Sequence, residues 1–380
     1  MVGSFSNVKT KKIMRIAFDY QAFCMQSYGG ISRYFTRLAQ ELQSLRQEVQ
    51  VFAPLHRNAY LALTQENMVY GRYIQRYLPK ATKFYLAYNF LKSSNQIEKW
   101  LPDIVHQTYY SNQVLRSKNF KTVISVYDMI HELYPNQFSV WDSTLRVKEK
   151  AIKRADHVIC ISENTKHDLM HFYSVPEQKI SVVHLGFDHV NPEIIGKVAS
   201  IHIRQPFLLY VGHRGGYKNF SGLLRAVASS PRLMKDFSIL AFGGNPFSSD
   251  ERALISALGF NDQQVFQYSG SDSNLQRCYQ TATAFVYPSM YEGFGIPPLE
   301  SMAQGCPVIS SNTSSMPEVI GNAAQFFNPN SIEEMKDAIE RVVYSGEVTE
   351  ALKIAGRNRL SCFSWEKCAK DTLRIYYELM

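Results

Sequence analysis

The segment Tyr291-Glu292-Gly293-Phe294-Gly295-Ile296-Pro297-Pro298-Leu299-Glu300 carries the most specific pattern in this chain. The residues just before it, 284–287, are apolar and predict a buried strand. Gly293 and Gly295 permit a sharp turn because glycine has no Cβ, and the two prolines suit the first turn of a helix that we expect to run to Gly305. The sequence therefore predicts a strand, a tight turn and a helix, with carboxylates on both sides of the turn.

These carboxylates, Glu292 and Glu300, lie on opposite sides of the predicted turn, the first in the loop and the second in the helix. We expect Glu300 in the first helical turn, where the helix dipole and free N–H groups favour an ionised carboxylate that can accept hydrogen bonds from a ribose diol. Glu292 precedes the glycines, whose backbone amides a polar or anionic ligand can approach closely. Taken singly, each is better explained as a solvated or dipole-complementing carboxylate. Their combination with the turn indicates a cradle for a nucleotide sugar, formed by Glu292, Gly293, Phe294, Gly295 and Glu300.

With 380 residues, 45% of them hydrophobic and 19% charged, the chain is long enough for two ordinary domains. Its apolar runs are short, and none reaches the roughly 20 residues that a membrane-spanning helix requires. Residues 1–12 are polar and lack the apolar centre of a signal peptide, so we expect a disordered tail and a cytoplasmic protein. The six cysteines form no C-x-x-C pair, which predicts reduced, buried thiols.

The net charge of +8 is unevenly distributed, because residues 1–190 contain 24 Lys and Arg against 15 Asp and Glu, whereas residues 191–380 contain 17 against 18. A basic first half suits an anionic partner, such as the inner leaflet of the cell membrane or a lipid-linked phosphate. Nucleic acid is not an expected partner, since no helix-turn-helix, zinc spacing or RNA-binding aromatic motif accompanies the charge.

One stretch of the basic half, residues 57–92, combines tyrosines with cations. Helical spacing would place the tyrosines on one face and the cations on a neighbouring stripe. Such a helix either lies on an anionic membrane or packs against its own domain, and packing is the more common case. The residues concerned are Tyr70, Tyr73 and Tyr77, with Arg72, Arg76 and Lys80.

Apolar strand-like runs alternate with helical segments along both halves, which predicts an α/β fold of two Rossmann-like domains. We expect the first domain at 13–190, with strands at 13–19, 49–53, 104–106, 123–127, 158–161 and 180–183 and a helix at 31–45. We expect the second at 206–362, with strands at 207–211, 237–242, 265–268, 284–287 and 308–310. Residues 191–205 predict a linker and residues 363–380 a final helix with Ser364 as N-cap. Ligands are expected in the cleft beyond the carboxyl ends of the strands.

A second glycine-rich loop, Gly212-His213-Arg214-Gly215-Gly216-Tyr217-Lys218, follows the first strand of the second domain and opens a helix. Its amides and the helix terminus, with the cations Arg214 and Lys218, suit a diphosphate that gains negative charge as it leaves. An ordinary basic surface loop is the alternative.

With these motifs the chain resembles the retaining glycosyltransferases of the two-domain GT-B fold, family 4, whose hallmark is two glutamates separated by seven residues. Residues 307–324 and Phe363-Ser364-Trp365-Glu366 also resemble the family, so the likeness covers nearly the whole chain. It implies sugar transfer from a nucleotide-diphosphate donor, with GDP-mannose as our first choice, to a glycan or lipid-linked glycan in bacterial surface polysaccharide synthesis. It also implies that the first domain binds the acceptor and that the final helix returns to it.

The resemblance assigns further donor-binding residues. Lys218 matches the family's phosphate-binding lysine, but Tyr217 stands where an arginine commonly precedes it, so Arg214 is the candidate replacement. Gly29 and Gly30 match the glycine-rich loop that approaches the donor from the first domain.

The resemblance also points to a strand end in the first domain, where Tyr127 stands in place of the histidine of the family's His-Asp pair. Asp128 remains, and Asp128 and His131 are candidates for contacting sugar or acceptor hydroxyls. A capping aspartate and a loop histidine are equally good interpretations. His106, which ends its own strand, is a further candidate for the cleft, although a lone histidine there is more often structural.

We expect no metal and no other cofactor. His167 and His171 have i, i+4 spacing but no recognisable third ligand, and no Asp-x-Asp signature is present. A glycosidase is disfavoured because it needs a carboxylic acid of raised pKa, whereas we expect Glu300 to stay ionised. A UDP-sugar donor, a catalytically inactive nucleotide-binding subunit and a sugar epimerase stay open as alternatives.

Overall fold

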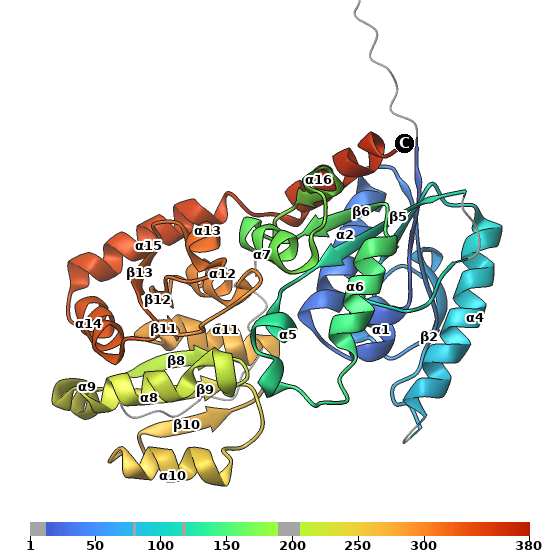
Figure 1. The fold of residues 1–380 in the computed structure, drawn as a ribbon. Coiled ribbons are helices and arrows are strands. Elements are labelled where there is room, and N and C mark those ends of the chain that lie inside the picture. The colour runs from blue at the N-terminus through green and yellow to red at the C-terminus, as the bar shows by residue number, and fades with distance from the viewer. Residues whose placement is uncertain (1–12, 79–80, 116–118, 189–205) are drawn as a thin grey trace, which may run out of the picture.

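The computed structural model describes residues 13–78, 81–115, 119–188 and 206–380. These residues form two α/β domains, each built on one parallel β-sheet with helices packed around it (Figure 1). The predicted fold class is therefore confirmed. The expected tail at 1–12, the linker at 191–205 and Lys80 lie outside the described residues.

The first domain contains a seven-stranded sheet in the order β3-β2-β1-β4-β5-β6-β7, with all neighbours parallel. Its strands are β1 (Arg15–Phe18), β2 (Glu48–His56), β3 (Val69–Tyr73), β4 (Ile104–Gln107), β5 (Lys121–Val126), β6 (His157–Cys160) and β7 (Ile180–Val182). Its helices are α1 (Gln21–Met25), α2 (Gly30–Ser44), α3 (Ala59–Ala62), α4 (Thr82–Trp100), α5 (Ile130–Leu133), α6 (Thr144–Arg154) and α7 (Glu163–Tyr173), with short 3-10 helices η1 (Glu66–Met68), η2 (Pro135–Gln137) and η3 (Glu177–Lys179).

The second domain contains a six-stranded parallel sheet in the order β10-β9-β8-β11-β12-β13. Its strands are β8 (Phe207–Val211), β9 (Ser238–Phe242), β10 (Val265–Tyr268), β11 (Ala284–Tyr287), β12 (Val308–Ser311) and β13 (Ala324–Phe327). Its helices are α8 (Phe220–Ala228), α9 (Pro231–Asp236), α10 (Ser249–Ala257), α11 (Asp272–Thr281), α12 (Ile296–Ala303), α13 (Met316–Ile320), α14 (Ile332–Val343) and α15 (Gly346–Leu360), with the 3-10 helix η5 (Gly216–Lys218) before α8.

The inner strands are buried on both faces, as in parallel sheets covered by helices, and every residue of β4, β6 and β11 is buried. The strand order changes direction between β1 and β4 in the first sheet and between β8 and β11 in the second. At such switch points doubly wound sheets bind their ligands. Both glycine-rich loops of the second domain follow the strands at its switch point, β8 and β11.

Every predicted strand overlaps an observed one, but the amphipathic helix predicted within 57–92 is wrong. Tyr70 and Tyr73 lie in β3, which pairs with β2, and the Tyr70 ring packs on Phe52 with centroids 5.9 Å apart. Tyr77 follows this strand and donates a hydrogen bond to the carbonyl of Leu55 at 2.9 Å. The spacing of the tyrosines fits a helix, but pairing with a neighbouring strand decides the conformation.

Two strands at or near sheet edges, β3 and β13, and the short helix α1 were not predicted. The helix that follows the glycine turn at 293–295, α12, begins at Ile296 and ends at Ala303, two residues before the predicted end at Gly305. Pro297 and Pro298 lie in its first turn as predicted, but Glu300 is its fifth residue and therefore lies beyond that turn.

The final helix, α16 (Trp365–Glu378), packs on α2 of the first domain (Figure 1). Ser364 is its N-cap, as predicted, and accepts a hydrogen bond from the amide of Lys367. Tyr376 bonds to Nδ1 of the fully buried His106 at 2.6 Å, and Ser125 bonds to Nε2 at 2.9 Å. Burial lowers the pKa of His106 to about 3, so this histidine is a neutral structural residue that fixes the last helix.

Within the described residues, no helix is both long enough and apolar enough to cross a bilayer. Five cysteine thiols are buried and free, as predicted, whereas Cys362 is exposed.

Candidate functional site

Lys218 and Glu292, predicted from separate loops, meet at the carboxyl ends of β8 and β11. The Lys218 Nζ lies 2.7 Å from Oε1 and 2.8 Å from Oε2 of Glu292, and Glu292 is only 8% exposed. Burial acts to lower the pKa of Lys218, but the Glu292 carboxylate outweighs it, so this pKa lies above the usual range. The site therefore holds a permanent, nearly buried cation against a carboxylate.

The loop that carries Glu292 is held in place by two serines of the segment before α13. The Glu292 amide donates to Oγ of Ser314 at 2.9 Å, and Ser315 Oγ donates to the carbonyls of Glu292 and Phe294 at 2.8 and 3.0 Å. Gly295 has φ 100°, a conformation that favours glycine. Among the described residues, no hydrogen bond is donated by the amides of Gly293, Phe294 or Gly295. A rigid loop thus presents uncommitted donors beside the Lys218–Glu292 pair.

Gly293 lies against the first domain. A Cβ at this position would lie 1.7 Å from the carbonyl oxygen of Tyr127 and 3.1 Å from the Cβ of Asp128. Only glycine permits this approach, which places Asp128 next to the loop of Glu292 across the cleft. Asp128 also accepts a hydrogen bond from the amide of Ile130 at 3.1 Å, although the N-cap residue of α5 is Met129 and not Asp128.

Glu300 lies on α12 and forms an ion pair with Arg33 of α2, at 3.1 Å from Oε1 to Nη1. Arg33 also binds Asp188 at 2.6 Å. Burial raises the pKa of Glu300, while Arg33 opposes that shift. Glu300 lies beyond the first turn, where the helix dipole mainly acts, so the expected support from the dipole is missing and Arg33 is the group that favours the ionised carboxylate.

Gly29 and Gly30 begin α2, one turn before Arg33. A Cβ on Gly29 would lie 2.3 Å from Oε1 of Gln26, whereas a Cβ on Gly30 would meet nothing within 4 Å. A side chain at position 29 would therefore displace Gln26, which accepts a hydrogen bond from the amide of Ser32. At position 30 there is open space at the start of the helix that carries Arg33.

Arg214 and His131 do not join this group. The three guanidinium nitrogens of Arg214 bind Glu251 (2.6 Å) and the carbonyls of Gly243 (3.2 Å) and Asn245 (2.6 Å), and its side chain is 5% exposed. Glu251 also closes the capping box of α10, so it holds Arg214 within the second domain. The His131 ring stacks on Phe138 at 3.8 Å and lies 3.5 Å from a carboxylate oxygen of Asp142.

The Phe294 side chain is buried in an aromatic cluster with His184 and Phe363, at ring distances of 5.8 and 5.7 Å. Gly212 has φ 125° and donates its amide to the carbonyl of Phe242 at 2.9 Å, so it shapes the loop that leads to Lys218.

The two tyrosines that depart from the family pattern have defined places. Tyr217 stacks on Tyr134 of the first domain with centroids 5.4 Å apart, and the Lys218 Nζ lies 5.3 Å from its ring. Tyr127 is buried and donates to the carbonyl of Thr108 at 2.9 Å. Tyr217 thus connects the domains beside Lys218, and Tyr127 supports the strand end that carries Asp128.

Sequence reasoning missed Arg33, Ser314 and Ser315. Arg33 could have been found from its place three residues after Gly30, near the start of a helix opened by a glycine pair. The two serines carry no such signal, since their role depends on how the segment before α13 folds over the loop of Glu292. Among the described residues, no three His, Cys, Asp or Glu side chains are grouped as metal ligands would be.

Two family models match consecutive parts of the chain: Glycosyltransferase Family 4 at residues 28–190 and Glycosyl transferases group 1 at residues 194–359. Among curated relatives, O-antigen chain mannosyltransferase B of Escherichia coli is 28% identical over 236 residues, covering 60% of this chain and 62% of the relative. O-antigen chain mannosyltransferase RfbU of Salmonella typhimurium is 29% identical over 251 residues, covering 63% and 67%. The match to the first relative thus spans about three fifths of that protein's length.

Solved structures of similar fold cover nearly the entire chain. The sucrose-phosphate synthase of Thermosynechococcus elongatus gives a TM-score of 0.74 at 20% identity, covering 97% of this chain and 99% of that structure. WaaG, a glycosyltransferase involved in lipopolysaccharide biosynthesis, gives 0.70 at 18% identity, covering 95% and 99%. Since the two family models follow one another along the two domains and the whole fold matches, the chain belongs to the family-4 glycosyltransferases of GT-B fold.

Proposed function

We propose that this protein is a retaining glycosyltransferase that moves a sugar from a nucleotide diphosphate to a hydroxyl of a glycan or lipid-linked glycan in bacterial surface polysaccharide synthesis. The observation that carries this proposal is the partly buried Lys218–Glu292 pair beside the uncommitted amides of Gly293, Phe294 and Gly295. A cation and amide donors suit the departing diphosphate, and a carboxylate suits the hydroxyls of the sugar.

In the proposed reaction the bond between the anomeric carbon and the diphosphate oxygen breaks, and a bond from the acceptor oxygen to the same carbon forms on the same face. The acceptor's proton passes to the departing diphosphate oxygen, so no protein nucleophile is required. Lys218 offsets the charge that accumulates on the diphosphate. Glu292 holds the transferred sugar, and Asp128 lies across the cleft from it. Glu300 accepts hydrogen bonds from the ribose after its ion pair with Arg33 has opened.

GDP-mannose is our first choice of donor, because two relatives from bacterial O-antigen synthesis are named mannosyltransferases. A UDP-sugar is the alternative, since a protein of similar fold, HepE of Anabaena, is described in complex with UDP-glucose. An inactive nucleotide-binding subunit is less consistent with a retained Lys218–Glu292 pair. We propose that no divalent ion takes part, because Lys218 and the loop amides can meet the charge of the diphosphate.

Peripheral contact with an anionic membrane is part of the proposal. Val140 and Trp141 are 92% and 91% exposed, just before α6, whose exposed residues include Arg146 and Lys150. An exposed tryptophan beside cations suits the interface of an anionic bilayer. Trp141→Ala should reduce co-sedimentation with phosphatidylglycerol vesicles, and unchanged co-sedimentation would remove this part of the proposal.

A thermal-shift panel of GDP, UDP, CDP and ADP, followed by turnover with the matching sugar donor, tests the function. We expect one nucleotide to stabilise the protein clearly more than the others. Glu292→Gln should still bind that nucleotide but lose transfer, because the amide retains the shape of the side chain without its charge. Asn358→Ala, at an exposed position on α15, is the control. Wild-type protein that neither binds a nucleotide nor releases one from a nucleotide sugar would contradict the proposal.

A further inference from the structure

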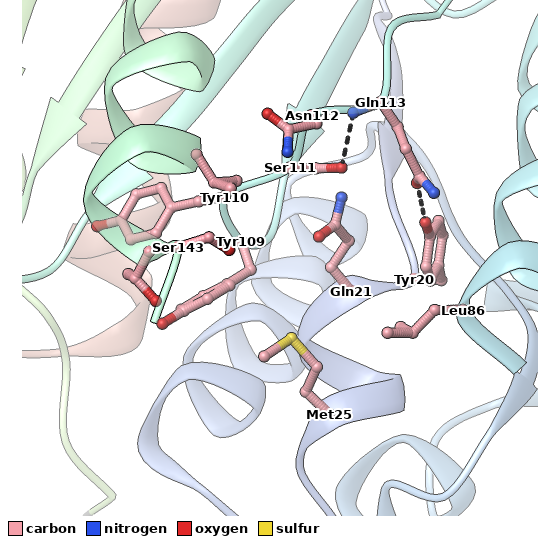
Figure 2. Close-up of a pocket in the computed structure, with 12 residues that line it drawn as sticks. Tyr20, Gln21, Met25, Leu86, Tyr109, Tyr110, Ser111, Asn112, Gln113 and Ser143 are labelled. Atoms are coloured by element: carbon pink, nitrogen blue, oxygen red, sulfur yellow. Dashed lines mark hydrogen bonds between the residues drawn. The ribbon is translucent and has the colours of Figure 1, made fainter. Parts of the chain in front are cut away.

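A pocket of about 340 Å³ opens on the first domain, at the carboxyl ends of β1 and β4 (Figure 2). Tyr109 and Tyr110 line one side of it, and Tyr20 and Gln113 lie on the other. Gln21 comes from the start of α1, and Ser143 and Thr144 come from the start of α6. The pocket is therefore built by loops at the switch point of the first sheet.

The pocket lies close to the proposed reaction centre. The rings of Tyr109 and Tyr110 are 6.3 and 6.4 Å from the ring of Tyr127. Tyr127 in turn offers its carbonyl to the position that Gly293 leaves free. A ligand in the pocket is thus separated from the loop of Glu292 by the segment of Tyr127 and Asp128.

The lining carries no charge. Its polar groups are tyrosine hydroxyls, serine and threonine hydroxyls and the amides of Gln21, Asn112 and Gln113. Burial raises the pKa of Tyr109 to about 12 and also raises that of Tyr20, so both hydroxyls stay neutral. An anion would find no cation in this lining.

The charged groups behind the lining have partners of their own. Lys148 lies 5.4 Å from the Tyr110 ring but is paired with Glu132 at 2.8 Å. Arg154 donates to the carbonyl of Ser111 at 2.8 Å. Asp142, next to Ser143, accepts from the amide of Thr144 at 2.7 Å. The charges therefore fix the walls of the pocket and leave its interior to aromatic rings and neutral hydrogen-bonding groups.

Part of the polar lining is held in position. Tyr20 donates a short hydrogen bond to Oε1 of Gln113, and the amide of Gln113 donates to Oγ of Ser111 at 3.0 Å (Figure 2). Asn112, which lies between Ser111 and Gln113 in the sequence, is exposed. Aromatic faces flanked by fixed amides and hydroxyls suit a pyranose ring, which has apolar C–H faces and a rim of hydroxyls.

We propose that this pocket holds the sugar of the acceptor and selects an uncharged hexose over an anionic one. This inference rests on the proposed function and names the substrate class of its acceptor. Tyr109 lies against a face of the sugar ring, and Asn112 and Gln113 bind its hydroxyls. The same chemistry fits the end of a soluble glycan and the head sugar of a lipid-linked one.

The binding test uses saturation-transfer NMR in the presence of the preferred nucleotide. The probes are the methyl glycosides of mannose, glucose, galactose and N-acetylglucosamine, with glucuronic acid and glucose 1-phosphate as anionic counterparts. We expect signals from at least one neutral glycoside and weaker signals from both anions. Tyr109→Ala and Asn112→Ala should each weaken the neutral signal at least threefold, whereas Tyr109→Phe, which retains the ring, and Asn358→Ala should preserve it.

The source of the sugar is tested with the octyl glycoside of the best probe in phosphatidylglycerol vesicles. A lower KM for this form than for the methyl glycoside supports a lipid-linked acceptor, and equal KM values support a soluble one. Absence of a neutral-sugar signal, stronger binding of the anions, or equal signals from Tyr109→Ala and wild type would overturn the inference. If nucleotides still stabilise the wild type in those cases, the proposed function stands and only the pocket assignment falls.

Discussion

The loops after β8 and β11 hold a paired cation and carboxylate, whereas the loops after β1 and β4 form a pocket of tyrosines, amides and hydroxyls. This contrast is the reverse of what the charges of the two halves suggest, since residues 1–190 carry the entire positive excess. Charge is placed where a diphosphate is expected to leave, and it is kept out of the pocket where a neutral hydroxyl is expected to react. The chemistry of each step, rather than the net charge of a domain, therefore explains the local composition.

The strongest test of the charged side is removal of its cation. Lys218→Ala should lower kcat by on the order of 10²–10³-fold, because the diphosphate loses a preorganised charge during departure. Lys218→Arg should retain part of the activity, since it preserves the charge but not the length and shape of lysine. Steady-state kinetics with the preferred donor measures both, with circular dichroism to confirm folding. Activity of Lys218→Ala close to that of the wild type would mean that the diphosphate is bound elsewhere.

The contact between the two regions can be broken at Gly293. Its replacement by Ala would place a Cβ 1.7 Å from the Tyr127 carbonyl, so the loop of Glu292 must move away from the first domain. We expect a loss of stability of about 1–3 kcal/mol and a marked fall in turnover. Gly30→Ala, where a Cβ meets nothing within 4 Å, is the matched control for stability. Urea unfolding compares the two, and equal midpoints would contradict the close approach.

The sequence was sufficient for the strands, the glycine turns and the pair of loops that bring Lys218 to Glu292, because apolar runs and glycines act locally. It was not sufficient for β3, since Tyr70 and Tyr73 fit helical spacing and their pairing with β2 depends on distant residues. The partner of Arg214 could not be read from the sequence for a similar reason. Its loop looks suited to a phosphate, but Glu251, 37 residues later, binds its guanidinium.

A smaller effect is expected from the ion pair between the regions, Arg33–Glu300. If Glu300 accepts from the ribose, nucleotide affinity falls as pH drops through its pKa, which burial raises. Arg33 opposes that rise, so Arg33→Met should move the acid limit of GDP binding to higher pH. Calorimetric titration across the acid range measures the limit. Pyrophosphate, which lacks ribose, is the control, and an identical shift with pyrophosphate would assign the effect to another group.

The smallest effect on nucleotide binding is expected at Arg214. Because its guanidinium is committed to Glu251 and to two carbonyls of the second domain, Arg214→Met should change nucleotide affinity by less than about twofold, as changes at independent sites do. The same change leaves Glu251 without its partner and should lower the free energy of unfolding by about 1–3 kcal/mol. Lys218→Met introduces the same side chain as Arg214→Met, but it should weaken nucleotide binding, which Arg214→Met leaves nearly unchanged. Calorimetric titration and urea unfolding of both variants separate the two roles. Strong loss of nucleotide affinity in Arg214→Met would show that the guanidinium leaves Glu251 for the diphosphate when the donor binds.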